Sequence, residues 1–102
     1  MPDTLTGISS LARIETPKAR GYLVQLCKHF AHKTQALVAN NRGKIEFTAG
    51  ACELDATNAI ALVIECSAAT DALLRTVEDV IERHLRRFAF KEELDIRWVR
   101  RF

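Results

Sequence analysis

Apolar residues at helical spacing predict two amphipathic helices. The first covers Pro17–Lys33, with Thr16 as its N-cap and the proline in the first turn, where a missing N–H costs no hydrogen bond. The second begins near Thr70 and ends between Phe88 and Phe90. Their apolar faces consist of Ala19, Leu23, Leu26, Cys27 and Phe30 in the first helix, and of Leu73, Leu74, Val77, Val80, Ile81, His84, Leu85 and Phe88 in the second.

Apolar residues that alternate with polar ones predict the strands. Turn residues at Asn40–Gly43 and Asp55–Asn58 separate three of them. Gly50 interrupts the alternation inside one strand, and we expect a β-bulge at that position. The predicted strands are Ser10–Thr16, Ala36–Ala39, Lys44–Leu54, Ala59–Cys66 and Leu94–Val99, with Ile45, Phe47, Ala49, Cys52, Leu54, Ile60, Leu62, Ile64, Cys66, Leu94, Ile96 and Trp98 facing inward.

The predicted element order is β-α-β-β-β-α-β. Two amphipathic helices can cover one face of such a sheet, so we expect an α+β fold: a two-layer sandwich with both helices on one face of a largely antiparallel sheet. A chain of 102 residues suffices for one core. We expect a loose N-terminal tail over residues 1–8 and a single domain over residues 9–102.

Composition narrows the possible functions. Hydrophobic residues make up 48% of the chain and charged residues 27%, which excludes a disordered protein. A net charge of +2 argues against nucleic acid as a partner, because nucleic-acid-binding domains carry a stronger basic excess. The longest apolar run, Ala59–Ile64, is too short to span a membrane, and the N-terminus lacks the pattern of a secretory signal. A cytoplasmic location is therefore expected.

Cysteine and histidine residues are the first candidates for a site. The chain has three cysteines, Cys27, Cys52 and Cys66, and an odd number argues against a disulfide framework. No two of them have Cys-x-x-Cys spacing, which argues against a zinc finger. Cys27 lies near His29 and His32, and thiolate and imidazole groups are ligands for zinc or iron. On a helix Cys27 and His29 point about 200° apart, so only the two histidines could share an ion. The alternative is a core cysteine beside exposed cationic residues near a helix C-terminus.

His84 stands in the apolar stripe of the second predicted helix. A buried imidazole needs a hydrogen-bond partner, so a structural role is one hypothesis. A pair with Cys27 or Cys52 would instead activate a thiol nucleophile, and a metal-ligand role is the third hypothesis. No residue is assigned as catalytic, and no cofactor is required. The candidate ligand or metal residues are Cys27, His29, His32, Cys52 and His84.

Two surfaces could carry a partner or ligand. Basic residues gather toward the C-terminus and could hold an anion, although a solvated face that compensates the helix dipole is the simpler interpretation. The sheet face opposite the helices is expected to remain open, and a homodimer or a protein partner could cover it. The basic residues are Arg83, Arg86, Arg87, Lys91, Arg97, Arg100 and Arg101.

Three stretches together resemble a known bacterial family. They are Tyr22–Lys33 (YLVQLCKHFAHK), Gly50–Leu54 (GACEL) and His84–Phe90 (HLRRFAF). In this order and spacing they are similar to the family of uncharacterised proteins called domain of unknown function 2218. The resemblance extends from about Ala12 to Trp98.

The resemblance implies a small stand-alone α+β protein, with a fold similar to the C-terminal domain of phosphohexomutases. Some relatives are joined to, or encoded beside, flavin-dependent siderophore-interacting reductases. This association implies a non-enzymatic accessory or binding domain linked to iron or siderophore metabolism, with such a reductase as a partner. The alternatives are a small metal-binding protein that uses His and Cys residues, with iron or zinc as the ion, and a thiol-dependent enzyme with a Cys–His pair.

Overall fold

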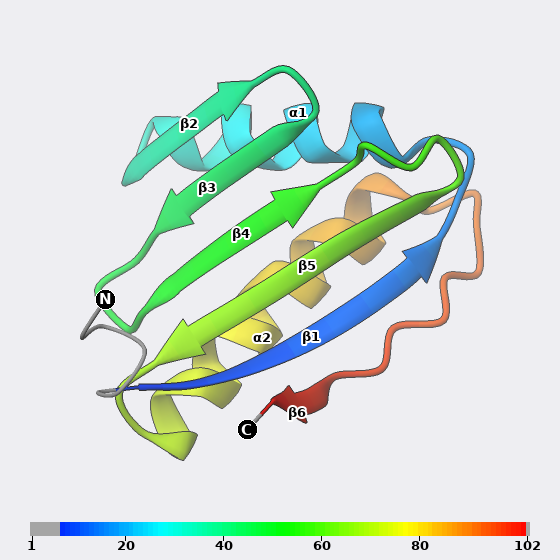
Figure 1. The fold of residues 1–102 in the computed structure, drawn as a ribbon. Coiled ribbons are helices and arrows are strands. Elements are labelled where there is room, and N and C mark those ends of the chain that lie inside the picture. Colours follow the sequence, from blue (N-terminus) through cyan, green and yellow to red (C-terminus); the bar gives the residue numbers. More distant parts are fainter. Residues whose placement is uncertain (1–6, 102) are drawn as a thin grey trace.

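The computed structural model describes residues 7–101 and shows one sheet with both helices packed on the same face (Figure 1). The expected α+β two-layer arrangement is confirmed. Most of the tail predicted for residues 1–8 lies outside the described residues. The elements are β1 (Ile8–Glu15), α1 (Ala19–Ala31), β2 (Gln35–Ala39), β3 (Arg42–Glu46), β4 (Ala51–Asp55), β5 (Ala61–Ala68), α2 (Asp71–Phe88) and β6 (Val99–Arg101).

The strands form a six-stranded sheet in the order β2-β3-β4-β5-β1-β6. Every neighbouring pair is antiparallel. Strands β2 to β5 follow one another as a meander, and β1 lies between β5 and β6 (Figure 1). Neither helix of the described chain combines the length and apolar character that crossing a membrane requires.

The core lies between the sheet and the two helices. Alternate residues of the central strands face the helices, as the alternation predicts. The apolar stripes of α1 and α2 cover them. The largest fully buried side chains are Ile14, Leu23, Leu26, Ile45, Leu54, Leu62, Ile64, Leu74, Ile81, Leu85, Val77 and Cys52.

The predicted long strand Lys44–Leu54 with a bulge at Gly50 is wrong. The structure has a hairpin there: β3 ends at Glu46, and Phe47 and Gly50 exchange two backbone hydrogen bonds of 2.7 and 3.2 Å. A Cβ atom on residue 50 would lie 2.2 Å from the carbonyl oxygen of Ser67, so only glycine fits. The interrupted alternation therefore marks a reversal of the chain.

The predicted final strand Leu94–Val99 is also wrong, because β6 covers only Val99–Arg101. The preceding segment, residues 89–98, has no strand or helix structure between α2 and β6. Its inward residues are placed as predicted: Leu94 is buried, and Ile96 and Trp98 pack against the core. Side chains of α2 hold this segment in place, since Arg86 donates to the Leu94 carbonyl at 3.1 Å.

Two element ends differ from prediction, and a third agrees with it. Helix α1 begins at Ala19, with Lys18 and not Thr16 at the N-cap. The Thr16 hydroxyl accepts from the Lys18 amide at 3.1 Å in the turn before the helix, and it donates to Glu92 at 2.9 Å. Ile60 was expected to face inward, yet it precedes β5 and is 61% exposed. Helix α2 begins as predicted, because the Thr70 hydroxyl accepts from the Leu73 amide at 3.2 Å.

Candidate functional site

The helix crossing brings two of the predicted site residues together. His29 of α1 and His84 of α2 have ring centroids 4.7 Å apart. Both side chains are half-buried, whereas His32 is exposed one turn further along α1. Cys27, on the buried face of α1, and Cys52, on β4, both lie in the core between the sheet and the helices.

Aromatic side chains enclose the histidine pair. The Phe30 ring lies 4.9 Å from both imidazoles, and the Phe88 ring lies 5.8 Å from that of His29. The Nδ1 atom of His84 is 2.7 Å from the Val80 carbonyl oxygen, which orients the ring. The Nε2 atom of His29 is buried without a hydrogen-bond partner. Among residues 7–101 no group of three or more His, Cys, Asp or Glu side chains could hold a metal, so the two histidines by themselves do not make a metal site.

Burial and positive neighbours both favour the neutral form of His29. Burial lowers the pKa of this imidazole below its ordinary value of 6.5, and the charges of His84, Lys33, Arg87 and His32 lower it further. A neutral imidazole can donate or accept a hydrogen bond or bind a metal. The two imidazoles therefore offer nitrogen ligand atoms at a half-buried site, and within residues 7–101 no carboxylate forms a hydrogen bond with either ring.

The three cysteines are free thiols in the core. Burial raises the pKa of Cys27. A hydrogen bond with Cys66, its partner across β4 and β5, raises the pKa of Cys52, and burial raises it further. A reactive thiolate needs access and a lowered pKa, and this environment provides the opposite. The described residues show no hydrogen bond between a thiol and His84, whose Nδ1 atom faces the Val80 carbonyl instead.

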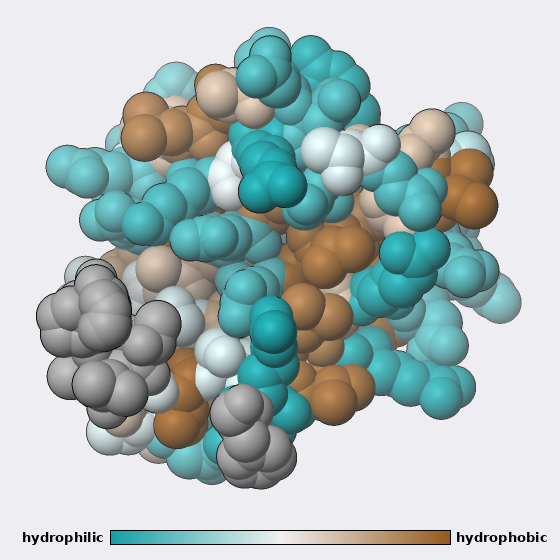
Figure 2. Space-filling model, viewed as in Figure 1, coloured by the Kyte–Doolittle hydropathy of each residue, from teal (hydrophilic) through white to brown (hydrophobic). Residues whose placement is uncertain are grey.

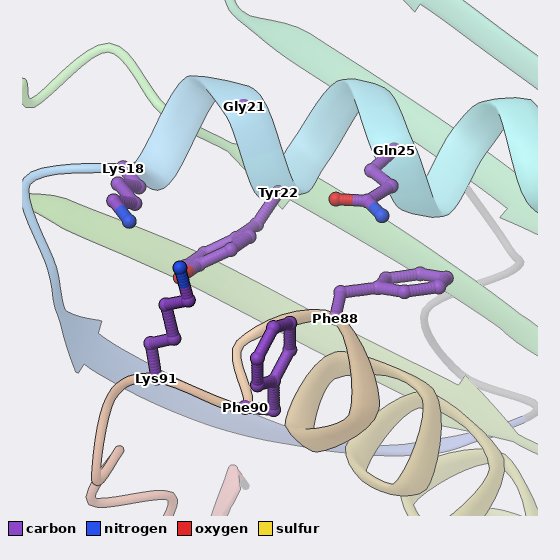
Figure 3. A pocket seen from close by; sticks show the side chains of 7 residues that line it. All are labelled: Lys18, Gly21, Tyr22, Gln25, Phe88, Phe90 and Lys91. Atoms are coloured by element: carbon purple, nitrogen blue, oxygen red, sulfur yellow. The ribbon is translucent and has the colours of Figure 1, made fainter.

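A cavity of about 460 Å³ lies between α1 and the end of α2, beside the histidine pair. Figure 3 shows Tyr22 and Gln25 on α1, and Phe88, Phe90 and Lys91 on the opposite side of the cavity. Of the residues that line this cavity, only Lys91 was predicted from the sequence as a binding residue, as a member of the basic set. The cavity is lined by Lys18, Gly21, Tyr22 and Gln25 on one side, and by Phe88, Phe90 and Lys91 on the other.

The cavity has a positive rim and an aromatic lining. The Lys91 ammonium lies 5.7 Å from the centroid of the Phe90 ring. Within the described residues neither Lys18 nor Lys91 forms an ion pair. Helix α1 begins at this rim, with no acidic residue in its first turn and no side-chain cap, so its dipole adds positive potential. This combination suits an anion that carries a flat apolar group.

A buried polar cluster supports the floor of the cavity. The hydroxyl of Tyr22 donates to the Glu92 carboxylate, and the Thr16 hydroxyl donates to the same group at 2.9 Å. Burial, with the hydrogen bond and negative charge of Glu92, raises the pKa of Tyr22 to about 12. Tyr22 is therefore a neutral phenol at physiological pH, and its hydroxyl is already engaged. It shapes the cavity and does not supply a proton.

The other predicted basic residues are largely neutralised by neighbours. Arg83 and Arg86 pair with acidic residues one turn earlier in α2, at 2.9 and 3.0 Å. Arg97 pairs with Asp95 at 3.0 Å, and Arg101 pairs with Glu65 at 3.2 Å. Arg100 contacts Asp71 at the start of α2. An anion site is therefore better placed at Lys18 and Lys91 than along this set.

The open face of the sheet is mixed in character. Figure 2 views this face and shows hydrophobic side chains across its middle, bordered by hydrophilic ones. Val99 is 64% exposed there, beside Leu11 of β1, its partner in the sheet. Arg42 pairs with Asp55 at 3.4 Å, and charged pairs of this kind occupy the border.

The comparisons with known proteins agree with this fold. The profile of a bacterial family, described as "Uncharacterized protein conserved in bacteria (DUF2218)", matches residues 11–99. The NMR structure of PA4090 from Pseudomonas aeruginosa is 30% identical in sequence, with a TM-score of 0.76; the match covers 89% of this chain and 94% of PA4090. No curated protein matches the chain.

The family match spans both helices and every residue that lines the cavity between them. The resemblance seen in the sequence is thereby confirmed. The family description assigns no function, so function has to be argued from the site. The chain belongs to the DUF2218 family of bacterial proteins, domain of unknown function 2218.

Proposed function

We propose that this protein is a non-enzymatic binding domain that takes a small aromatic anion in the cavity between α1 and the end of α2. The observation that carries the proposal is that two lysine side chains and two phenylalanine rings line the same cavity. They are Lys18, Lys91, Phe88 and Phe90. Such a lining matches a flat ring that bears a carboxylate. A volume of about 460 Å³ lies within the range of small-molecule sites.

The lining supports binding rather than catalysis. It contains no Ser, Thr or Cys nucleophile and no carboxylate. Its one phenol, Tyr22, has its pKa raised to about 12, and its hydroxyl donates a hydrogen bond to Glu92. The thiols lie in the core with raised pKa values, which also argues against a thiol-dependent enzyme.

The link to iron metabolism that the family resemblance implies fits the same chemistry. Catechol siderophores are assembled from aromatic acids that carry a carboxylate and phenol groups. A domain that holds such an acid, or the siderophore end made from it, could serve a flavin-dependent reductase as an accessory. The three free thiols suit the reducing cytoplasm, which we infer as the location.

The test is a titration of the protein with dihydroxybenzoate, followed by amide chemical shifts in NMR and by calorimetry. We expect saturable shifts at the cavity and weaker binding of the uncharged benzamide analogue. The Lys18→Gln and Lys91→Gln variants should each lose about tenfold in affinity, since a charge-assisted contact contributes roughly 1.5 kcal/mol or more.

A matched control is Lys28→Gln, which removes an exposed lysine of α1 outside the cavity. It should bind as the unaltered protein does. The proposal is wrong if dihydroxybenzoate causes no saturable shifts, or if all three lysine variants bind equally well.

A further inference from the structure

Strand β2 is an edge of the sheet that pairs with no second strand among residues 7–101, and its sequence is neutral and apolar. It reads Gln35-Ala-Leu-Val-Ala39, without a charged residue or a proline. It pairs with β3 residue for residue, so no bulge distorts it. Leu37 is 73% exposed and Val38 is 43% exposed. A flat, neutral, apolar edge presents unpaired backbone N–H and C=O groups to any strand that meets it.

The opposite edge of the sheet shows how an edge is normally protected. Strand β6 has only three residues, and two of them are arginines. Arg100 contacts Asp71 and Arg101 contacts Glu65, so charged side chains border this edge. Short length and charge are the usual devices against strand pairing between molecules. Strand β2 has neither, although it lies in the same sheet.

We propose that β2 pairs antiparallel with β2 of a second copy of this chain, around a two-fold axis at Leu37. Each sheet of six strands would then continue into the other. Gln35 would lie opposite Ala39 of the second copy, and Ala36 opposite Val38. Leu37 would lie opposite its own equivalent and bury its exposed side chain there.

The absence of charge in β2 suits pairing with a second copy of the same strand. A strand that pairs with itself places identical residues near the axis, so any charge in β2 would oppose a like charge. None is present between Gln35 and Ala39. The nearest charge in the sequence, Lys33, would lie opposite the neutral Asn41 of the second copy. The strand is thus compatible with its own equivalent along its full length.

This interface leaves the cavity free. The residues that line the cavity belong to α1, to the end of α2 and to the segment that follows, and none belongs to β2. Pairing at β2 and anion binding can therefore be tested separately. Failure of either one leaves the other intact.

The experiment is sedimentation velocity of the full chain from micromolar to about millimolar concentration, since edge pairing alone gives a modest affinity. We expect a monomer–dimer equilibrium. Leu37→Lys and Leu37→Glu should each be monomeric, because like charges would meet at the axis. An equimolar mixture of the two variants should form a heterodimer again, since the opposite charges then pair.

The control is Val99→Lys, at the opposite edge, which should dimerise like the unaltered chain. Circular dichroism confirms that each variant is folded. The proposal is overturned if the unaltered chain is monomeric throughout the range, if Leu37→Lys dimerises unchanged, or if Val99→Lys abolishes the dimer. The last result would place the interface at the open face near β6.

Discussion

At the scale of single residues, His29 makes stability depend on pH. Its folded pKa is below 6.5, because burial and the charges of His84, Lys33, Arg87 and His32 disfavour the imidazolium. As the pH falls through 6.5, the unfolded chain takes up a proton that the folded chain does not. Acid therefore favours unfolding. The free energy of unfolding should therefore be highest above pH 6.5 and should decrease with falling pH until the folded pKa is reached. Urea titrations at a series of pH values from about 8 to about 5 measure this decrease.

The variant His29→Phe isolates this contribution. A phenyl ring can replace the imidazole among Phe30 and Phe88 and does not titrate. The decrease in stability below pH 6.5 should become shallower in this variant. Lys28→Gln, at an exposed position of the same helix, should keep the original slope. Equal slopes in His29→Phe and the unaltered chain would show that another group causes the dependence.

The thiols provide a second prediction at this scale. Cys27, Cys52 and Cys66 are buried, and the pKa values of Cys27 and Cys52 are raised, so a thiol reagent at about pH 8 should label the folded protein slowly. Labelling should become fast and complete in urea. Ser67→Cys supplies the comparison, because Ser67 is exposed on the strand that carries Cys66. A native thiol that reacts as fast as the introduced one would revive the thiol-enzyme hypothesis.

At the scale of elements, the hairpin between β3 and β4 depends on Gly50. Alanine there would place its Cβ 2.2 Å from the Ser67 carbonyl oxygen, and backbone cannot move aside cheaply. We expect Gly50→Ala to lower the free energy of unfolding by about 2 kcal/mol in urea titrations. Gly21→Ala is the control: nothing lies within 4 Å of a Cβ there, and a helical alanine should stabilise by up to about 1 kcal/mol. Equal effects of the two substitutions would refute this account of the turn.

The same hairpin shows what local sequence can and cannot predict. The helices and most strands follow from spacing, since Thr70, Leu74 and Leu85 lie where the pattern places them. An interrupted alternation at Gly50 has two local solutions, a bulge and a reversal. The close approach of Ser67, seventeen residues later, decides between them. Tertiary contact is the missing information there.

The end of the chain and the candidate site show the same limit. The alternation of apolar and polar residues correctly predicts that Leu94 and Trp98 face the core. It cannot predict where the strand begins, because a strand needs a partner and β1 pairs with β6 only from Val99 onward. His29 and His84 could be singled out one by one as candidates. Their approach depends on how α1 crosses α2, which the periodicity of neither helix specifies. The cavity at Lys18 depends in addition on the irregular path of residues 89–98.

At the scale of the whole molecule, residues 89–98 connect the two ends of the fold. Glu92 binds Thr16, just after β1, and Tyr22 in α1. Further along, the Trp98 indole donates to Glu82 of α2 at 2.9 Å. One irregular segment thus ties α1, α2 and β1 together and forms one side of the cavity. A substitution that loosens this segment should therefore weaken ligand binding in the cavity and lower the free energy of unfolding of the domain together.

Glu92→Ala tests this coupling, because it leaves the buried hydroxyls of Thr16 and Tyr22 without their acceptor. Unsatisfied buried groups of this kind cost about 2 kcal/mol, which chemical unfolding should show. The chain has one tyrosine, so the absorbance of tyrosinate after a rapid alkaline jump reports Tyr22 alone, and its pKa should fall from about 12. Dihydroxybenzoate should also bind more weakly, although Glu92 does not line the cavity. The control Glu93→Ala removes an exposed neighbour and should change none of these quantities. If Glu92→Ala behaves like Glu93→Ala, the segment is held by its apolar contacts and not by Glu92.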